Sequence, residues 1–398
     1  MNFLSQKAKN IAPSLTLAIT AKANALKKEG KDIVSFTAGE PDFNTPDFVI
    51  EAAKKALDSG YTKYTPVSGI LPLREAICAS LKHKHNLEYA PNQIVVSCGA
   101  KHSLYNAFLA LLDEGDEVLI ISPYWLSYPE MVTLAGGMPK IITTTKEDNY
   151  KLTPAILEKS ITKKTKVIVL NNPSNPSGIV YSKAEFMALA SIIEKAGIFV
   201  ISDEIYDELI YTGEKPYSLA SYSDKLKDKT IVINGVSKAY AMTGWRIGYT
   251  ASNVELATSM DNIQSQTTSN ANSIAQYASV TALTPSEKAD NFLSELKNIF
   301  QKRKNLICEL LDEIPSLPYI KPNGAFYVMV DVSRFFGKIL HNKKINSASD
   351  FSELLVEKSL VVTIPTESFG ANDFIRLSYA IAEEDMIKGI ERIKKFIL

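Results

Sequence analysis

The chain has 398 residues, which at about 100–200 residues per domain predicts two or three structural units. Its composition is 45% hydrophobic and 22% charged with 18 glycines and 18 prolines, which excludes a disordered, collagen-like or low-complexity protein. Because 44 lysines and arginines balance 44 aspartates and glutamates, no global charge draws the chain to nucleic acid or to an anionic membrane.

The N-terminal part indicates a protein that is neither secreted nor membrane-spanning. Residues 1–7 lack the apolar core of a signal peptide, and no stretch approaches about 18 consecutive apolar residues. We therefore expect a cytoplasmic protein. Up to about Pro46 we expect an arm, a helix over Leu17–Glu29 and a short extended segment, which join a smaller domain formed by the end of the chain.

Between residues 90 and 250, short apolar runs alternate with amphipathic stretches, a pattern typical of strand–helix–strand units in a mostly parallel sheet. The expected strands are Ile94–Ser97, Glu117–Ser122, Ile141–Thr143, Lys166–Leu170, Ile198–Ser202 and Thr230–Asn234. Expected helices between them include Leu104–Leu112 and Tyr128–Ala135. Strands that are buried on both faces are almost wholly apolar, as Val167–Leu170 is.

Polar residues follow five of these strands. Because ligands of a parallel sheet bind beyond the carboxyl ends of its strands, we expect these residues to line one crevice. The five segments are Gly99–Lys101, Tyr124–Trp125, Asn171–Asn175, Asp203–Tyr206 and Ser237–Lys238.

The pattern changes after Pro285. A long charged helix over Lys288–Leu311 precedes extended segments and two helices, which suits a smaller α+β domain. We therefore divide the chain into an N-terminal arm with part of the small domain (1–47), a large cofactor-binding domain (48–287) and a C-terminal small domain (288–398). The uncharged stretch Asn262–Ser286 is rich in Gln, Ser, Thr and Asn, and we expect it to form a polar helix in a contact surface.

Several familiar motifs are absent. The sequence has no GxGxxG, GxxxxGKS/T or GxSxG, so dinucleotide-binding, P-loop and α/β-hydrolase functions have no motif support. The three cysteines and four histidines show neither a disulfide framework nor zinc-ligand spacing. We therefore expect no metal centre.

One set of residues points to covalent chemistry on a cofactor. A lysine that follows a buried strand, as Lys238 does, is poorly solvated, which lowers its pKa and frees its amine; a surface lysine in a turn is the alternative. Together with Lys238, the residues Asp203, Tyr206 and Asn175 are what a pyridine cofactor requires. The carboxylate pairs with the ring nitrogen, two hydrogen-bonding groups with the phenolate, and the lysine with the aldehyde.

Two further features would complete such a site. Ser97–His102 runs from strand to helix through small residues, so its N–H groups could cradle a phosphate, and Trp125 offers an aromatic face on which a ring can stack. Each feature also has a purely structural interpretation: a packed turn, a core tryptophan and, for Asp203, a helix cap.

These residues belong to a longer, ordered set of motifs. The blocks are Ala38–Phe43, Lys63–Gly69, Pro123–Glu130, Asn172–Gly178, Ser202–Tyr206, Val236–Gly248, Gly324–Tyr327 and Ile375–Ala380. The set resembles the class I and II aminotransferases of the pyridoxal-phosphate fold type I superfamily, in their bacterial aspartate aminotransferase branch, which includes prephenate aminotransferases. The resemblance implies an α/β fold: a large domain with a mainly parallel seven-stranded sheet flanked by helices, and a smaller α+β domain.

The resemblance implies pyridoxal 5'-phosphate as the cofactor and a role for each residue around its ring. Lys238 would bond covalently to the cofactor and later move the substrate proton. Asp203 would keep the ring nitrogen protonated, Tyr206 and Asn175 would bond to the phenolate oxygen, and Trp125 would stack on the ring.

The resemblance also implies the remaining binding groups. The phosphate side would be lined by Gly99, Ala100, Lys101, Ser237 and Arg246, with Tyr64 reaching in from the other subunit of a homodimer. The substrate carboxylate would bind Arg376 with help from Gly39, Asn175 and Trp125. Lys101 resembles the lysine that recognises a distal carboxylate, which favours aspartate and glutamate.

The implied reaction is ping-pong amino transfer between L-aspartate, or a related amino acid, and 2-oxoglutarate, giving oxaloacetate and L-glutamate. A carbon–sulfur β-lyase is an alternative function, because it would share every cofactor residue. A transcriptional regulator is a third class, but it would need an N-terminal helix-turn-helix domain, for which we expect no room because the resemblance begins at residue 3. Prephenate or aromatic substrates stay open: Pro13, Ser14 and Thr16 match prephenate-using members, whereas Ala12 replaces their lysine.

Overall fold

The computed structural model describes the whole chain except residues 1–2, 6–7, 10 and 12–14. Ala12, Pro13 and Ser14, on which the comparison with prephenate-using proteins depends, thus lie outside the described residues. Within the described part of the chain, no helix has both the length and the apolar character needed to cross a lipid bilayer.

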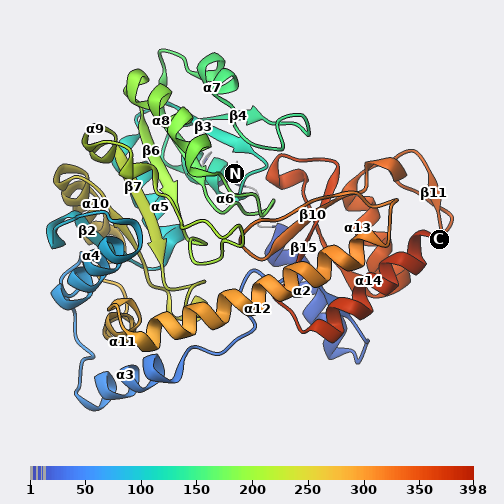
Figure 1. Ribbon diagram of the computed structural model, residues 1–398, viewed down its shortest axis with the longest axis horizontal. Helices are drawn as coiled ribbons and strands as arrows, with labels where there is room; N and C mark the ends of the chain where they lie inside the picture. The colour runs from blue at the N-terminus through green and yellow to red at the C-terminus, as the bar shows by residue number, and fades with distance from the viewer. Residues whose placement is uncertain (1–2, 6–7, 10, 12–14) are drawn as a thin grey trace.

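A seven-stranded sheet forms the centre of the larger part of the molecule, with strands in the order β2-β8-β7-β6-β5-β3-β4 (Figure 1). Its strands are β2 (Ile94–Ser97), β3 (Glu117–Ser122), β4 (Met138–Thr143), β5 (Thr165–Asn171), β6 (Phe199–Asp203), β7 (Thr230–Gly235) and β8 (Gly248–Ala251). Only β8 runs antiparallel to its neighbours β2 and β7, so the predicted mainly parallel sheet is confirmed. The sequence analysis missed β8, because its four residues, Gly-Tyr-Thr-Ala, form no apolar run.

Alternate side chains of each strand pack on opposite faces of this sheet, as the two-residue period of a strand requires. Val167 and Val169 pack in the cluster that contains α5 (Ala100–Leu111), α6 (Ser127–Leu134) and α10 (Val254–Thr267). Ile168 and Leu170 face α7 (Pro154–Ser160), α8 (Lys183–Ala196) and α9 (Asp224–Asp228). The rest of that second face is covered by α3 (Asp47–Asp58), α4 (Leu71–His85) and α11 (Ser273–Leu283).

A four-stranded antiparallel sheet, β14-β15-β10-β9, forms the centre of the smaller part, drawn in orange and red in Figure 1. Its strands are β9 (Tyr319–Ile320), β10 (Tyr327–Asp331), β14 (Ile364–Pro365) and β15 (Phe374–Ser378). The other elements there are α2 (Leu15–Lys28), β1 (Val34–Ser35), β11 (Ile339–Leu340), β12 (Lys343–Lys344), α13 (Ala348–Ser359), β13 (Val361–Val362) and α14 (Glu383–Ile397). Val34 of β1 pairs with Val361 of β13, so a segment near the N-terminus joins the C-terminal part.

One long helix, α12 (Glu287–Asp312), connects the two parts without a break. It runs across the front of the molecule in Figure 1. Its first turns pack Ala289 and Leu293 against α3, α4 and α11, whereas Leu296 and Phe300 pack in the core of the smaller part. The domain bounds at 47/48 and 287/288 stay a prediction.

The stretch Asn262–Ser286 is not the single polar helix that we expected. It contains the end of α10 and the whole of α11, which are separated where Ser269 adopts a positive φ of 61°. Gln264 and Gln276 are fully buried, and Gln264 accepts a hydrogen bond from Ser97 at 2.7 Å. Neutral amides can be buried at less cost than ions, so much of the missing charge reflects packing within this chain.

Candidate active site

A cleft of about 460 Å³ lies at the carboxyl ends of the parallel strands and is bordered by residues of the smaller part. The predicted site residues that line it are Gly39, Ala100, Lys101, Trp125, Asn175, Asp203, Tyr206, Ser237, Lys238, Arg246 and Arg376. The structure thus brings all five strand ends together. Gly99 is not among the lining residues but packs against the guanidinium of Arg246, which is. Tyr64 lies outside this cleft with 92% of its surface exposed.

Lys238 projects into the cleft from the loop that follows β7. Its Nζ donates a hydrogen bond to the Gly39 carbonyl at 2.5 Å and lies 5.9 Å from the centre of the Tyr206 ring. Burial lowers the pKa of Lys238 to about 8; the carboxylate of Glu40 opposes this shift, and the guanidinium of Arg246 adds to it. The amine is therefore neutral more often at pH 7 than that of an exposed lysine.

Asp203 ends β6 and is buried beneath the cleft. Burial raises the pKa of its carboxyl to about 6, although hydrogen bonds to the charged form act in the other direction. The Tyr128 hydroxyl donates to Oδ2 at 2.6 Å and the Ile205 N–H donates to Oδ1 at 3.3 Å. Turns rather than a helix follow Asp203, so the helix-cap interpretation does not apply.

Tyr206 and Asn175 face the cleft from neighbouring strand ends. The Tyr206 hydroxyl lies 3.0 Å from the Tyr327 hydroxyl. Asn175 is fixed through its backbone N–H, which donates to Asn171 Oδ1 at 2.8 Å, and its peptide bond to Pro176 is cis, as are Ser122–Pro123 and Asn172–Pro173. Both polar side chains are thus oriented by neighbours.

Arg376 is a buried guanidinium on β15 of the second sheet, with 2% of its surface exposed. Its Nη1 donates to Asn175 Oδ1 at 3.0 Å, and the guanidinium lies 4.4 Å from the centre of the Tyr327 ring. Burial lowers its pKa from the ordinary value. Its buried Nε has no hydrogen-bond partner among the described residues, so a donor is left for the carboxylate of a ligand, which the planar fork of arginine matches.

The start of α5 and the guanidinium of Arg246 form a small cationic cradle. Gly99 precedes the helix with a φ of +87°, which glycine adopts without strain, and a Cβ atom there would lie 2.1 Å from Arg246 Nη2 and so displace the guanidinium. Arg246 is held by hydrogen bonds from Nη1 to the Thr243 carbonyl at 2.8 Å and from Nη2 to the Cys98 carbonyl at 3.3 Å. Helix N–H groups beside a guanidinium suit a phosphate.

Lys101 and Trp125 border the same cleft. The Lys101 ammonium lies 4.8 Å from the centre of the Trp125 ring. Burial, and then the charge of Arg246, lower the pKa of Lys101. Trp125 is only half-buried and meets the Tyr128 ring edge-on, so its ring is not simply a core side chain.

The sequence analysis gave no role to several other residues of the cleft, and four of these lie close to predicted site residues. These are Glu40, Tyr128, Thr243 and Tyr327. Each lies within one of the motif blocks, and that position was the only sequence signal that could have indicated a role in the site. None directly follows a strand of the central sheet, so the search for polar residues at strand ends did not find them. Their positions depend on contacts between distant parts of the chain, such as the 2.6 Å bond from Tyr128 to Asp203.

The donor set fits the cofactor predicted from the resemblance. A buried carboxylate suits a protonated ring nitrogen, the cradle at Gly99 suits a phosphate, and Lys238 supplies an amine of lowered pKa. The unpartnered Nε of Arg376 leaves a place for a substrate carboxylate.

Comparisons with known proteins agree with this geometry. The family model for aminotransferase class I and II matches residues 31–393. An aspartate aminotransferase of Bacillus subtilis is 44% identical over 395 residues, covering 99% of this chain and 98% of the relative. A probable aspartate/prephenate aminotransferase of Aquifex aeolicus is 44% identical over 392 residues and covers 98% of each chain. The solved structure of an aspartate aminotransferase from Thermus thermophilus with maleate is 39% identical and superposes with a TM-score of 0.94 over 100% of both chains.

Proposed function

Because the chain belongs to the class I and II aminotransferases, enzymes that use pyridoxal phosphate, we propose that it transfers the amino group of L-aspartate to 2-oxoglutarate, giving oxaloacetate and L-glutamate. The observation that carries this proposal is the convergence of Asp203, Lys238 and Arg376 on one cleft. Relatives named aspartate aminotransferase, at 44% identity, support aspartate as the donor. Relatives named aspartate/prephenate aminotransferase make prephenate the second candidate substrate.

We assign the cofactor to the residues that line the cleft. When bound, pyridoxal phosphate supplies an aldehyde carbon that bonds to amines and a ring that withdraws electrons from the substrate. Asp203 would accept a hydrogen bond from the ring nitrogen, Tyr206 and Asn175 would hold the ring oxygen, and Trp125 would cover one ring face. The phosphate would be held by Gly99, Ala100, Lys101, Ser237 and Arg246.

The substrate and its proton are assigned to two cationic side chains. Arg376 would bind the α-carboxylate, since its guanidinium is already oriented by Asn175 and retains a free donor. Lys238 Nζ would take the proton from the α-carbon of the amino donor. In the second half-reaction it would give a proton to the α-carbon of the amino acceptor. With a pKa of about 8, roughly one tenth of the lysine side chains carry a neutral amine at pH 7 before any cofactor binds.

We assign the distal carboxylate of the substrate to Lys101. Its ammonium lies at the cleft wall beside Trp125, and Arg246 is close enough to lower its pKa, so the wall is cationic. An anionic substrate group would relieve the repulsion between these two cations.

Steady-state rates with aspartate, glutamate, phenylalanine, tyrosine, prephenate and phenylpyruvate test the proposed substrates. We expect the highest kcat/KM for aspartate with 2-oxoglutarate, and parallel lines in double-reciprocal plots. Lys101→Met should lower kcat/KM for aspartate by about tenfold to a hundredfold, the loss expected for a charged hydrogen bond, and change that for phenylalanine by less than about twofold. Equal losses for both donors would contradict the role of Lys101, and faster turnover of prephenate than of oxaloacetate would make prephenate the substrate.

We further propose that the enzyme is a cytoplasmic homodimer with shared active sites. Tyr64 is exposed and lies away from the cleft of its own chain, which suits a residue that completes the cleft of a partner. An open hollow lined by Trp245, Arg246 and Ile274 adjoins the cationic cradle and offers a place for a partner side chain.

Subunit mixing tests this arrangement. When Tyr64→Phe and Lys238→Ala chains exchange, each mixed dimer should contain one site with both defects and one with neither, so activity should return to nearly the parent value per intact site. Sedimentation as an active monomer, or exchange without recovery of activity, would contradict the shared site.

A further inference from the structure

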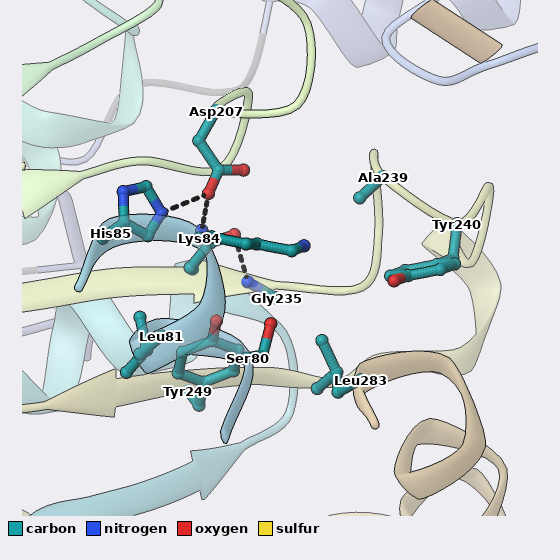
Figure 2. A pocket seen from close by; sticks show the side chains of 11 residues that line it. Ser80, Leu81, Lys84, His85, Asp207, Gly235, Ala239, Tyr240, Tyr249 and Leu283 are labelled. Carbon is teal, nitrogen blue, oxygen red and sulfur yellow. Dashed lines mark hydrogen bonds and ion pairs between the residues drawn. The ribbon is translucent and has the colours of Figure 1, made fainter. Parts of the chain in front are cut away.

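A buried polar cluster, part of which is drawn in Figure 2, lies outside the cleft and contains residues close in sequence to Asp203 and Lys238. It joins the last residues of α4, Lys84 and His85, to Asp207 in the turns after β6 and to Asn234 in β7. Its central cavity of about 10 Å³ has room for at most one water molecule, so direct contacts hold the cluster together. The proposed function uses none of these four residues.

Asp207 links three elements through one carboxylate oxygen. Its Oδ2 accepts a hydrogen bond from His85 Nε2 at 3.0 Å, which Figure 2 shows as a dashed line, and a second from Asn234 Nδ2 at 2.9 Å. Asn234 Oδ1 in turn accepts the N–H of Gly235 at 2.7 Å. Asp207 therefore ties the turns after β6 to the end of β7.

These links are close to the proposed catalytic groups in the chain. Asp207 follows Asp203 by four residues, and Asn234 precedes Lys238 by four residues. The two strands pair in parallel at this level, with Asp203 opposite Ile233. Short, mostly buried segments of the chain therefore connect Asp207 to Asp203 and Asn234 to Lys238.

His85 supplies the charge that allows Asp207 to stay ionised. Burial alone would lower the pKa of His85, but the hydrogen bond to Asp207 and the charge of Glu204 raise it above the ordinary value. Burial works to raise the pKa of Asp207, but His85 lowers it below the ordinary value. Both shifts favour an ion pair between the imidazolium of His85 and the carboxylate of Asp207.

Other charged and titratable groups surround the pair. Glu204 faces His85 from the turns after β6, and Lys84, bonded to Glu208, opposes the imidazolium charge from α4. Tyr249 of β8 also lies within reach of Asp207. His85 Nδ1 and Glu204 Oε2 are both buried without a hydrogen-bond partner in the described structure, so the ring of His85 depends on its bond to Asp207 for orientation.

We propose that His85 is a positioning residue, which by pairing with Asp207 holds the ends of β6 and β7 together and so fixes Lys238 relative to Asp203. This inference rests on the proposed roles of those two residues. Removing the imidazolium would leave a buried carboxylate uncompensated, and such a charge either takes up a proton or pulls its segment toward solvent. Either change loosens Asn234 and the loop that carries Lys238.

The test compares His85→Gln with His83→Gln in the holoenzyme. His83 lies two residues earlier in α4, with more than half of its side chain exposed, so its substitution is the matched control. For His85→Gln we expect kcat to fall by about tenfold or more with KM changed by less than about twofold. The pH midpoint of the visible cofactor absorption and the affinity of the cofactor-free protein for pyridoxal phosphate should also change. The double variant His85→Gln/Asp207→Asn, which removes the lone charge, should recover much of the loss.

Two results would overturn the inference. One is a His85→Gln protein that unfolds more easily but matches His83→Gln in kcat, absorption midpoint and cofactor affinity, because His85 would then be merely structural. The other is a His85 ring that titrates at or below about 6.5 by NMR in the unaltered holoenzyme, a measurement that decides the question even where the variant does not fold. A parent enzyme that is inactive on aspartate but shows the expected His85 titration would refute the proposed substrate and not the pair.

Discussion

Removing the Tyr128 hydroxyl should change the proton affinity of Asp203 in a calculable way. Tyr128 donates to Asp203 Oδ2 at 2.6 Å, and its own raised pKa keeps the hydroxyl protonated. A hydrogen bond to a charged acceptor contributes about 1.5–3 kcal/mol, which at about 1.4 kcal/mol per unit corresponds to about 1–2 pKa units. In Tyr128→Phe the pKa of Asp203 should therefore rise from about 6 to about 7–8 in the cofactor-free protein.

The assay measures the affinity of the cofactor-free protein for pyridoxal phosphate between about pH 5 and 9. At pH 7, the ionised share of Asp203 should fall from about nine tenths to between about a half and a tenth, so the binding curve of Tyr128→Phe should move to higher pH by about 1–2 units. Tyr105→Phe, on helix α5 and not bonded to Asp203, is the control.

A second readout is the free energy of unfolding of the cofactor-free protein. Because the folded pKa of Asp203 lies above its ordinary value of 3.8, the folded state keeps a proton that the unfolded state has lost, and stability falls as pH rises from about 4 to 6. This difference in pKa, about two, amounts to about 3 kcal/mol. In Tyr128→Phe this fall should continue to about pH 7–8. Superimposable binding and stability curves for the three proteins would refute this account of Asp203.

Four further substitutions follow from the site. Lys238→Ala should abolish both the visible absorption of the bound cofactor and turnover, so normal turnover would remove Lys238 from the mechanism. Asp203→Asn should lower kcat by about 10²–10³-fold, typical of one lost electrostatic group, with cofactor affinity less affected; a change below about threefold would indicate a structural role. Gly99→Ala should weaken cofactor binding in equilibrium dialysis, because the added Cβ would lie 2.1 Å from Arg246 Nη2. Gly244→Ala is the control and should leave binding unchanged, because a Cβ there has no heavy atom within 4 Å. Arg376→Lys keeps the positive charge but loses the bidentate hydrogen bonding of a guanidinium to a carboxylate. In steady-state assays kcat/KM for aspartate should fall by about tenfold to a hundredfold, and an unchanged value would mean that the substrate carboxylate binds elsewhere.

Much of the fold could be predicted because its signals are local. A parallel strand buried on both faces is an unbroken apolar run, so β3 and β5 were predicted almost to their ends. A short strand without an apolar run, such as β8, carries no such signal and was found only through its pairing with neighbouring strands.

The candidate site divides in the same way. Asp203 ends β6, and Asn175 and Lys238 come within four residues of the ends of β5 and β7, so their convergence on one cleft follows from the topology of a parallel sheet. Gly99 was found as part of a strand-to-helix turn, but its close approach to Arg246, 147 residues later, is visible only in the structure.

Three features were decided by tertiary structure alone. Tyr128 acts on Asp203 across 75 positions of sequence, and Arg376 meets Asn175 across 201. The pairing of His85 with Asp207 likewise spans 122 positions. Local patterns report on the few residues of one turn or strand, whereas a hydrogen bond between buried side chains depends on how whole elements pack. The sequence by itself therefore predicted the groups to which we assign the chemistry, and the packing of α4, α6 and β15 against the strand ends decided which partners set their charge and position.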